Sequence, residues 1–488
     1  MPDPRKRIVV DGVDFAQIVR FPRILRAVTA AMQPPRLLIA LFMVLLLLAV
    51  GRTWDGATEP RAHPAGITLG EMPVQDRAAA QETLRRAMRS YVPADDLPEG
   101  DPDEWALLDA RDVLTRVRAG YRERRETEFG DAQLGRADRR FRSTIAAIDE
   151  SRPRGSFEAV SVHLGAQTVR IVRGVLFLRP IEVFEGFKQT FVDLPRALWR
   201  HHLLFTLVYG TFALLVLAIG GGALSRMAAC EISGRQKLRV IEAWQFALVH
   251  WPRLVLALLL PLLLAAALAV IILLPGVIMN VPGLNIIGAL IYGALLILGL
   301  LIALLLLVYA LGFGLLLPAV ACENCDAADA QQRAYAYVLQ RPLHLLGYGA
   351  VAVIGLALGY LVVSLFAVTA LNVTADLFGT FTASAAMSQA GGFDIFNFNP
   401  AAASVEIAPN WHTGTAAWLI GFWQSIVVAL VAAYVFSYFF SAATAVYLLM
   451  RQTCDGQDPE EIWYPGLVPG TLAPMPPTRV EEVQKREA

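Results

Sequence analysis

Three long stretches of this 488-residue chain, residues 254–322, 342–375 and 407–450, contain no Asp, Glu, Lys or Arg. A helix needs about 20 apolar residues to cross a hydrocarbon core roughly 30 Å thick, and a charged side chain is costly inside that core. Charged residues make up 17% of the chain, whereas an average soluble domain has about 25%. The stretches therefore predict membrane-spanning helices and exclude an ordinary soluble protein.

Six segments are long and apolar enough, or nearly so, to span a bilayer. They are residues 37–51, 203–225, 254–280, 284–318, 345–371 and 416–450. The sequence therefore predicts a mainly α protein. Its expected fold is a six-helix transmembrane bundle with a mostly helical (α+β) soluble domain inserted between the first and second transmembrane helices.

Basic residues set the expected orientation, because cytosolic segments of membrane proteins are enriched in Lys and Arg. Residues 1–36 hold seven basic residues against three acidic ones, which predicts a cytosolic N-terminal segment. Six crossings then return the tail 451–488 to the cytosol, in a bacterial inner (cytoplasmic) membrane. Free thiols suit that side, and all four cysteines fall there: Cys230, Cys322, Cys325 and Cys454.

The basic N-terminal segment has an amphipathic part. Apolar residues alternate with arginines from Phe15 to Val28, a pattern that fits an interfacial helix on an anionic leaflet or the flank of an ordinary signal anchor. Both interpretations keep residues 37–51 as the first transmembrane helix.

Residues 52–201 differ in kind, since they carry 24 basic and 24 acidic residues. We expect them to form an extracytoplasmic soluble domain. Its parts are a linker at 52–70, helices at 72–91, 103–126 and 130–149, one or two strands at 156–178, and an amphipathic helix over 179–200. The strands are expected from the β-branched residues and the alternation of that segment.

The membrane domain, residues 202–450, contains an internal sequence repeat in two connections between spans, which we call elbows. Two connections begin with Cys-Glu, continue with an Ala-aromatic-x-aromatic element and end on a Pro before the next span. The matching pairs are Cys230-Glu231 and Cys322-Glu323, Ala243-Trp244 and Ala334-Tyr335, and Pro252 and Pro342. The pattern predicts two parallel helix-elbow-helix repeats within a five-helix transmembrane domain.

These elbows resemble the repeated loops of uncharacterised bacterial polytopic membrane proteins. The similarity covers about residues 220–370 and extends to the membrane domain fused to some glycerophosphodiester phosphodiesterases. It implies a membrane fold and topology. The catalytic barrel that those enzymes carry is absent from this sequence, so the resemblance implies no activity.

Chemical motifs are sparse. Cys322 and Cys325 have a spacing that can hold a metal or form a redox pair. No second ligand pair of that kind occurs, so two small residues ending a helix are the favoured explanation. No phosphate loop is present, and the balance of 42 basic and 42 acidic residues gives no reason to expect nucleic acid. We expect no catalytic residue, resident metal or cofactor.

Small residues recur at helix-packing intervals in the last two spans. Such spacing lets helix backbones approach closely in lipid. The residues are Gly355 and Gly359, followed by Ala429, Ala433, Ser437, Ser441 and Ala445. Packing within the chain and a homodimer face both fit this pattern.

These features favour a non-enzymatic integral membrane protein, a scaffold or partner-binding protein of the cell envelope. Its expected contacts are membrane lipids and an envelope protein bound through residues 52–201. The alternative is a permease or flippase-like protein for lipids or hydrophobic solutes. A third hypothesis is a thiol-dependent enzyme or metal site at Cys322 and Cys325.

Overall fold

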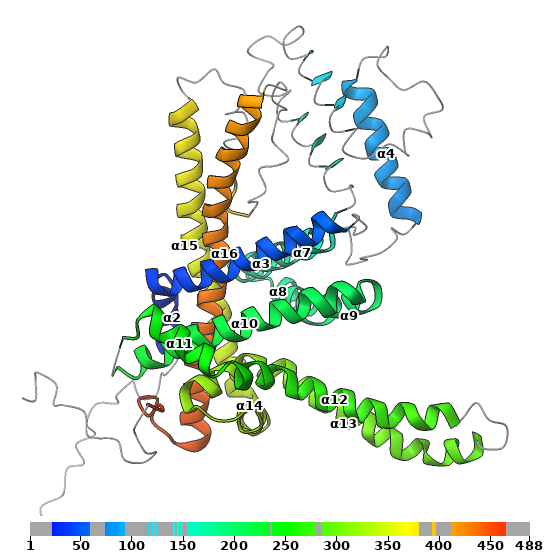
Figure 1. Ribbon diagram of the computed structural model, residues 1–488, viewed down its shortest axis with the longest axis vertical. Coiled ribbons are helices and arrows are strands. Elements are labelled where there is room, and N and C mark those ends of the chain that lie inside the picture. Colours follow the sequence, from blue (N-terminus) through cyan, green and yellow to red (C-terminus); the bar gives the residue numbers. More distant parts are fainter. Residues whose placement is uncertain are drawn as a thin grey trace, which may run out of the picture. The chain divides into compact units, whose positions relative to one another are not determined.

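The computed structural model describes residues 22–58, 74–92, 154–234, 237–278, 285–379, 393–396 and 411–464, and single positions between 113 and 148. Across these residues the regular structure is helical and no β-strand is formed. Figure 1 shows the helices in chain order. The mainly α fold predicted from the sequence is confirmed for this part of the chain.

Six of the helices are long and apolar enough to cross a membrane. They are α3 (Pro34–Ala57), α10 (Leu203–Ile232), α12 (Trp251–Ile278), α13 (Asn285–Glu323), α15 (Pro342–Gly379) and α16 (Trp411–Asp455). Each coincides with one of the six predicted spans. The protein is therefore a multi-pass membrane protein by the length and composition of its helices.

Several of these helices are longer than the sequence predicted. The 45 residues of α16 correspond to about 67 Å at 1.5 Å per residue, roughly twice the hydrocarbon thickness. At the N-terminal side, α3 continues to Ala57, so the predicted linker 52–70 begins as helix, and its residues 59–70 lie outside the described part. Helical hydrogen bonding therefore extends past the purely apolar segments.

Shorter helices connect or flank the spans. They are α2 (Pro22–Ala31), α4 (Val74–Tyr91), α7 (Ser156–Leu176), α8 (Pro180–Lys188), the π-helical turn η3 (Gln189–Asp193), α9 (Leu194–His201), α11 (Val240–Val249) and α14 (Ala327–Gln340). Both predicted elbows contain such a helix, α11 in the first and α14 in the second. Pro252 and Pro342 lie in the first turns of the helices that follow.

The strands predicted at 156–178 are wrong, because this segment is the single helix α7. Its buried side chains include Phe157, Ile171 and Val172, on one helical face. The helix start is fixed from outside the segment: both carboxylate oxygens of Asp55 accept hydrogen bonds, from the backbone N–H of Phe157 at 2.9 Å and of Glu158 at 2.8 Å. A cap supplied by a residue about 100 positions away leaves no local sequence signal.

Replacing Asp55 by Ala should loosen the first turn of α7. Loss of a carboxylate N-cap costs about 0.5–2 kcal/mol of helix stability, so the amides of Phe157 and Glu158 should exchange with deuterium faster by a factor consistent with that range. Asp55→Asn keeps one acceptor oxygen and should have a smaller effect. Unchanged exchange in Asp55→Ala would show that the cap does not hold this turn.

The segment between the first two spans contains a small helical core. The helix predicted at 72–91 is confirmed as α4, and described positions within 103–126 and 130–149 are helical. Tyr121 stacks on Phe141 with ring centroids 3.9 Å apart. Around this pair the buried residues are Leu84, Ala87, Met88, Val92, Val113, Val117, Ile145 and Ile148. The other residues of the two predicted helices lie outside the described residues.

The predicted interfacial helix of the N-terminal segment is described only from Pro22 onward, as α2, and its residues before Pro22 lie outside the described part. In α2, Ile24 and Ala31 are fully buried. The hydroxyl of Ser437 donates a 2.9 Å hydrogen bond to the carbonyl of Ala31. The face of α2 that carries Ile24 and Ala31 is thus packed against protein.

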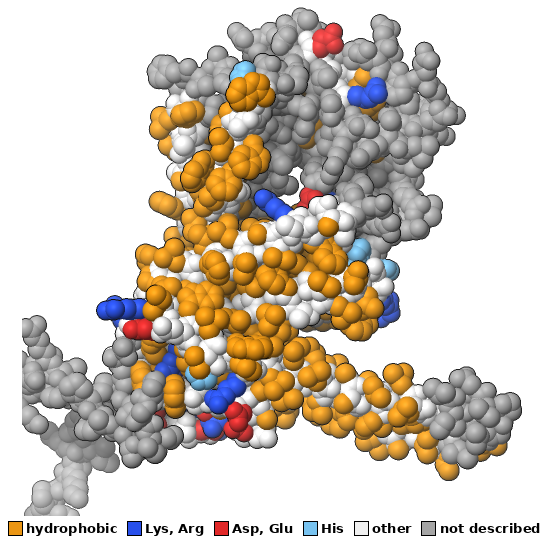
Figure 2. Space-filling view, viewed as in Figure 1, with side chains coloured by type: hydrophobic (Ala, Val, Ile, Leu, Met, Phe, Trp, Pro, Cys, Tyr) orange, Lys and Arg blue, Asp and Glu red, His pale blue; other side chains and the backbone are white. Residues whose placement is uncertain are grey.

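The chain divides into two compact units, each assembled from segments distant in the sequence. One contains residues 221–349 and the stretch from Phe440 onward; the other contains Ile24–Gly220 and Ala350–Phe439. In the first unit α12 and α13 lie side by side and pack on α14. Figure 2 shows hydrophobic side chains along the exposed surface of this pair, as expected for helices that face lipid.

Candidate functional site

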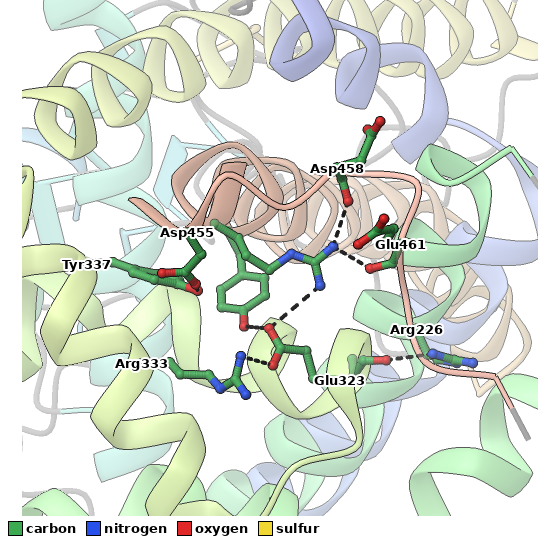
Figure 3. A network of polar contacts seen from close by, with 10 residues as sticks. Arg226, Glu323, Arg333, Tyr337, Asp455, Asp458 and Glu461 are labelled. Carbon is green, nitrogen blue, oxygen red and sulfur yellow. Dashed lines mark hydrogen bonds and ion pairs between the residues drawn. The ribbon is translucent and has the colours of Figure 1, made fainter. Parts of the chain in front are cut away.

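A group of charged and hydroxyl side chains lies where α10, α13 and α16 end in the first unit, and it includes the buried Arg226 and Arg451. We call it the polar clasp. It consists of Arg226, Glu323, Arg333, Tyr337, Tyr447, Arg451 and Asp455, most of which are labelled in Figure 3. We call the segment 456–464, which follows α16, the strap.

Glu323 is the central acid of the clasp and the last residue of α13. Its side chain is 10% exposed. One carboxylate oxygen lies 3.7 Å from Nη1 of Arg451 and accepts a hydrogen bond from the Tyr447 hydroxyl, and the other oxygen pairs with Arg333. A buried carboxylate needs such charged partners, because desolvation otherwise outweighs its attraction to any single one.

Arg451 connects this acid to the strap. Its side chain is 2% exposed, and Nη2 donates to the backbone carbonyls of Asp458, at 2.9 Å, and Glu461. A planar guanidinium presents several donors in a fixed geometry. Arg451 therefore pairs with Glu323 through one nitrogen and holds the strap through another.

Arg226 provides the second attachment. Its Nη1 donates to the carbonyl of Ala321 and its Nη2 to the carbonyl of Trp463, each at 2.8 Å. The backbone N–H of Trp463 donates in turn to the carbonyl of Cys322 at 2.7 Å. The last carbonyls of a helix lack intrahelical partners, so the strap and Arg226 satisfy the C-terminal end of α13.

Aromatic rings enclose the Arg226 guanidinium. It lies 5.1 Å from the ring centroid of Phe246, 5.4 Å from that of Trp463 and 5.5 Å from that of Tyr464. Cation–π contacts of this kind stabilise a guanidinium that has been removed from water. Phe246 belongs to α11, so the first elbow helix also takes part in fixing the strap.

The second elbow helix, α14, contributes Arg333 and Tyr337. The Tyr337 hydroxyl donates to Asp455 at the end of α16. Burial, together with this hydrogen bond, raises the pKa of Tyr337 well above its usual value. The phenol therefore stays protonated and serves as a fixed hydrogen-bond donor rather than as a base.

Arg253, at the start of α12, caps the turn after α13. Its Nη1 lies 3.2 Å from both the backbone and the side-chain carbonyl oxygens of Asn324, and its Nε lies 3.4 Å from Asp326. Asn324 has a φ of 53°, the left-handed conformation that commonly ends a helix and that Asn tolerates. Both elbow regions thus hold the end of α13 in place.

The candidate thiols occupy the same region. Cys322 is buried, Cys325 is partly buried, and neither forms a disulfide. Among the residues that the structure describes, no three His, Cys, Asp or Glu side chains are grouped so that they could hold a metal ion. Burial, followed by the nearby Glu323 carboxylate, raises the pKa of Cys325 to about 12, which suppresses the thiolate that redox and metal chemistry need.

We expect Cys325 to react slowly with N-ethylmaleimide in the folded protein. Since only the thiolate attacks, the rate at about pH 8 should be at least tenfold below that in the detergent-unfolded chain. It should keep rising about tenfold per pH unit beyond about pH 9, where the rate in the unfolded chain levels off. Peptide mass spectrometry of both samples measures this. Equal rates in folded and unfolded protein would contradict the protonated, sheltered thiol.

The small residues predicted to pack helices lie in α15 and α16. Ala429, Ala433, Ser437, Ser441 and Ala445 are all buried. In the second unit Gly355 lies against Tyr438 and Gly359 against Tyr434, and the Tyr438 hydroxyl donates to the carbonyl of Ala352 at 2.7 Å. The tyrosines of α16 thus pack against the glycines of α15 within one chain.

Sequence reasoning missed the clasp. No motif in the sequence marks Arg226 or Arg451, and the strap lies within the predicted tail 451–488. One signal was present: Glu323 belongs to the Cys-Glu element that occurs in both elbows. Comparison with known proteins finds no matching family model, no matching curated protein and no matching solved structure.

Proposed function

We propose that this multi-pass membrane protein is a non-enzymatic scaffold or partner-binding protein of the bacterial cell envelope. The observation that carries the proposal is the polar clasp. Its buried charges are engaged with one another and with the backbone of the strap. Groups used in this way hold structure and leave no acid, base or nucleophile directed at a bound molecule.

Both termini are proposed to face the cytosol. The clasp gathers Arg226, Arg333 and Arg451 where α10, α13 and α16 end, and Lys and Arg beside the ends of spans mark the cytosolic side. A reporter of compartment fused after residue 488 should read as cytosolic, whereas one inserted near residue 120 should read as extracytoplasmic. A cytosolic signal near residue 120 would overturn this topology.

The partner is proposed to bind the segment between the first two spans. On α4, Glu82, Arg86 and Arg89 form an exposed charged face opposite the buried Leu84 and Met88. The salt bridge between Glu82 and Arg86, 3.6 Å long, is largely in solvent. Such a face is polar and accessible, as the surface of a transient protein contact commonly is.

Photo-crosslinking in cells tests this assignment. A photoreactive residue at Arg89 should give one discrete protein adduct, and the same residue at Leu300, which α13 exposes to lipid, should give none. The permease or flippase alternative is tested with purified protein in liposomes. Protein-dependent movement of a fluorescent phospholipid between leaflets, together with no adduct at Arg89, would favour that alternative and overturn the scaffold.

A further inference from the structure

Helices α7, α8 and α9, with η3 between the last two, form a hairpin whose two ends meet. α7 packs along α8, with Gly186 of α8 seated against Ile171 and Gly174 of α7 against Val183. The side chain of Ser156, at the start of α7, lies 3.0 Å from Nδ1 of His202, just after α9. The chain therefore enters and leaves this hairpin at the same place.

One side of the hairpin is fixed to helices that are long and apolar enough to span a membrane. Asp55 of α3 caps α7, and Phe157 packs on Tyr209 of α10, with ring centroids 5.3 Å apart. Farther along α7, Val172 is fully buried in a cluster with Ala357 and Tyr360 of α15 and Val431 of α16. The hairpin is thus in apolar contact with membrane-spanning helices of its own unit.

The other side of the hairpin is an exposed row of large apolar residues, which we call the apolar stripe. Its members are Ile181, Phe184, Phe191 and Trp199, between 52% and 72% exposed. They recur at the spacing of one helical face along α8, η3 and α9. The sequence predicted an amphipathic helix here, and the structure turns most of its apolar face outward rather than into a protein core.

Charged residues of the hairpin are mostly paired. Arg170 lies 3.6 Å from Glu185, and Arg179 lies 2.9 Å from Glu182. Lys188, which falls within the apolar stripe, lies 4.0 Å from Asp193, and its long stem can place the ammonium at a polar boundary. Paired and snorkelling charges are compatible with a helix at the edge of a bilayer.

The chain runs directly from the apolar stripe into the exposed apolar residues of a candidate span. Immediately after α9, α10 exposes Leu203, Leu204 and Leu207, within a helix that is itself a candidate span. Trp199 and Arg200 precede this point, and tryptophan and basic residues are favoured where acyl chains meet headgroups. This continuity identifies lipid as the occupant of the stripe.

We propose that the α7–α9 hairpin lies in the interface of the bilayer crossed by α3 and α10, with the apolar stripe docked against its acyl chains. The hairpin then belongs to the membrane part of the protein and not to an aqueous domain. Because both of its ends meet, it changes neither the number of crossings nor their order. The soluble part between the first two spans ends before Ser156.

Site-directed spin labels on the full chain test this proposal. The four native cysteines are replaced by Ala, and Phe184→Cys, Phe191→Cys and the control Glu182→Cys are labelled and reconstituted in vesicles of phosphatidylcholine and phosphatidylglycerol. Position 182 lies about 100° around the helix from its neighbour Ile181. We expect the ratio of oxygen to nickel-chelate accessibility to be roughly fivefold higher at 184 and 191 than at 182.

Two results would overturn the proposal. A ratio at 184 and 191 equal to that at 182 would place the stripe in water. Low accessibility to both reagents would place it under protein, as a contact with a second copy or a partner. If the cysteine-free chain does not fold, photo-crosslinking from position 184 of the otherwise native chain replaces the spin-label experiment. Adducts with phospholipid support the proposal, whereas adducts with protein, or no adducts, oppose it.

Discussion

Replacing Glu323 by Gln is expected to lower the free energy of unfolding by about 3–5 kcal/mol, the range found when one partner of a buried ion pair is removed. The substitution keeps the shape of the side chain and removes its charge. Arg451, which is 2% exposed, then remains buried opposite a neutral amide. Arg333 loses the same partner.

The change is measured as the fall in apparent melting temperature of the purified protein in detergent, compared with Glu82→Gln. Glu82 pairs with Arg86 at the surface, where removal of a pair costs only about 0–1 kcal/mol. Proteolysis adds a local readout, since the strap should become cleavable in Glu323→Gln at temperatures where the native chain resists. Equal melting temperatures for the two variants would show that Glu323 does not hold the clasp.

Replacing Gly359 by Leu is expected to be the second strongly destabilising change. Even the Cβ of an Ala at this position would meet the Tyr434 hydroxyl and the side chain of Val28. Overpacking of a close contact costs about 1–3 kcal/mol for a few added methylenes and more where the neighbours cannot move. Tyr434 is fully buried, so α15 and α16 would have to separate.

The matched control is Gly347→Leu in the same helix, because a Cβ at Gly347 meets no atom within 4 Å. A melting temperature that falls for Gly359→Leu and not for Gly347→Leu supports the contact. The hydroxyl of Tyr434 is buried with no hydrogen-bond partner among the described residues. Adding Tyr434→Phe to Gly359→Ala should therefore recover part of the loss, and failure to recover would assign the clash to the backbone or Val28.

The membrane part of this fold could be predicted because its cause is local. The absence of charged residues from a segment such as 254–322 is enough to predict that it lies in the membrane, since any charge within it would be costly in hydrocarbon. The small-residue pattern is local in the same way, and in the structure Gly355 lies against Tyr438 and Gly359 against Tyr434. Which residues would lie against these glycines could not be foreseen, since helix partners are set by the tertiary arrangement.

The errors have a common physical origin in contacts between distant residues. The β-branched side chains and the alternation of residues 156–178 predict strands, whereas a cap from Asp55 and packing on α3 select a helix. The clasp escaped detection for the same reason. A guanidinium that binds backbone carbonyls, as Arg226 and Arg451 do, places no requirement on the side chains of the residues it binds.

The strap also sets an order of events in biosynthesis. Arg226 and Trp463 are 237 residues apart, so the guanidinium is made long before its second carbonyl partner emerges from the ribosome. Until then Nη2 of Arg226 and the carbonyl of Cys322 lack the partners that the strap provides. The clasp can close only after the strap, which follows α16 in the chain, has been synthesised, so its closure requires all six candidate spans to have been made first.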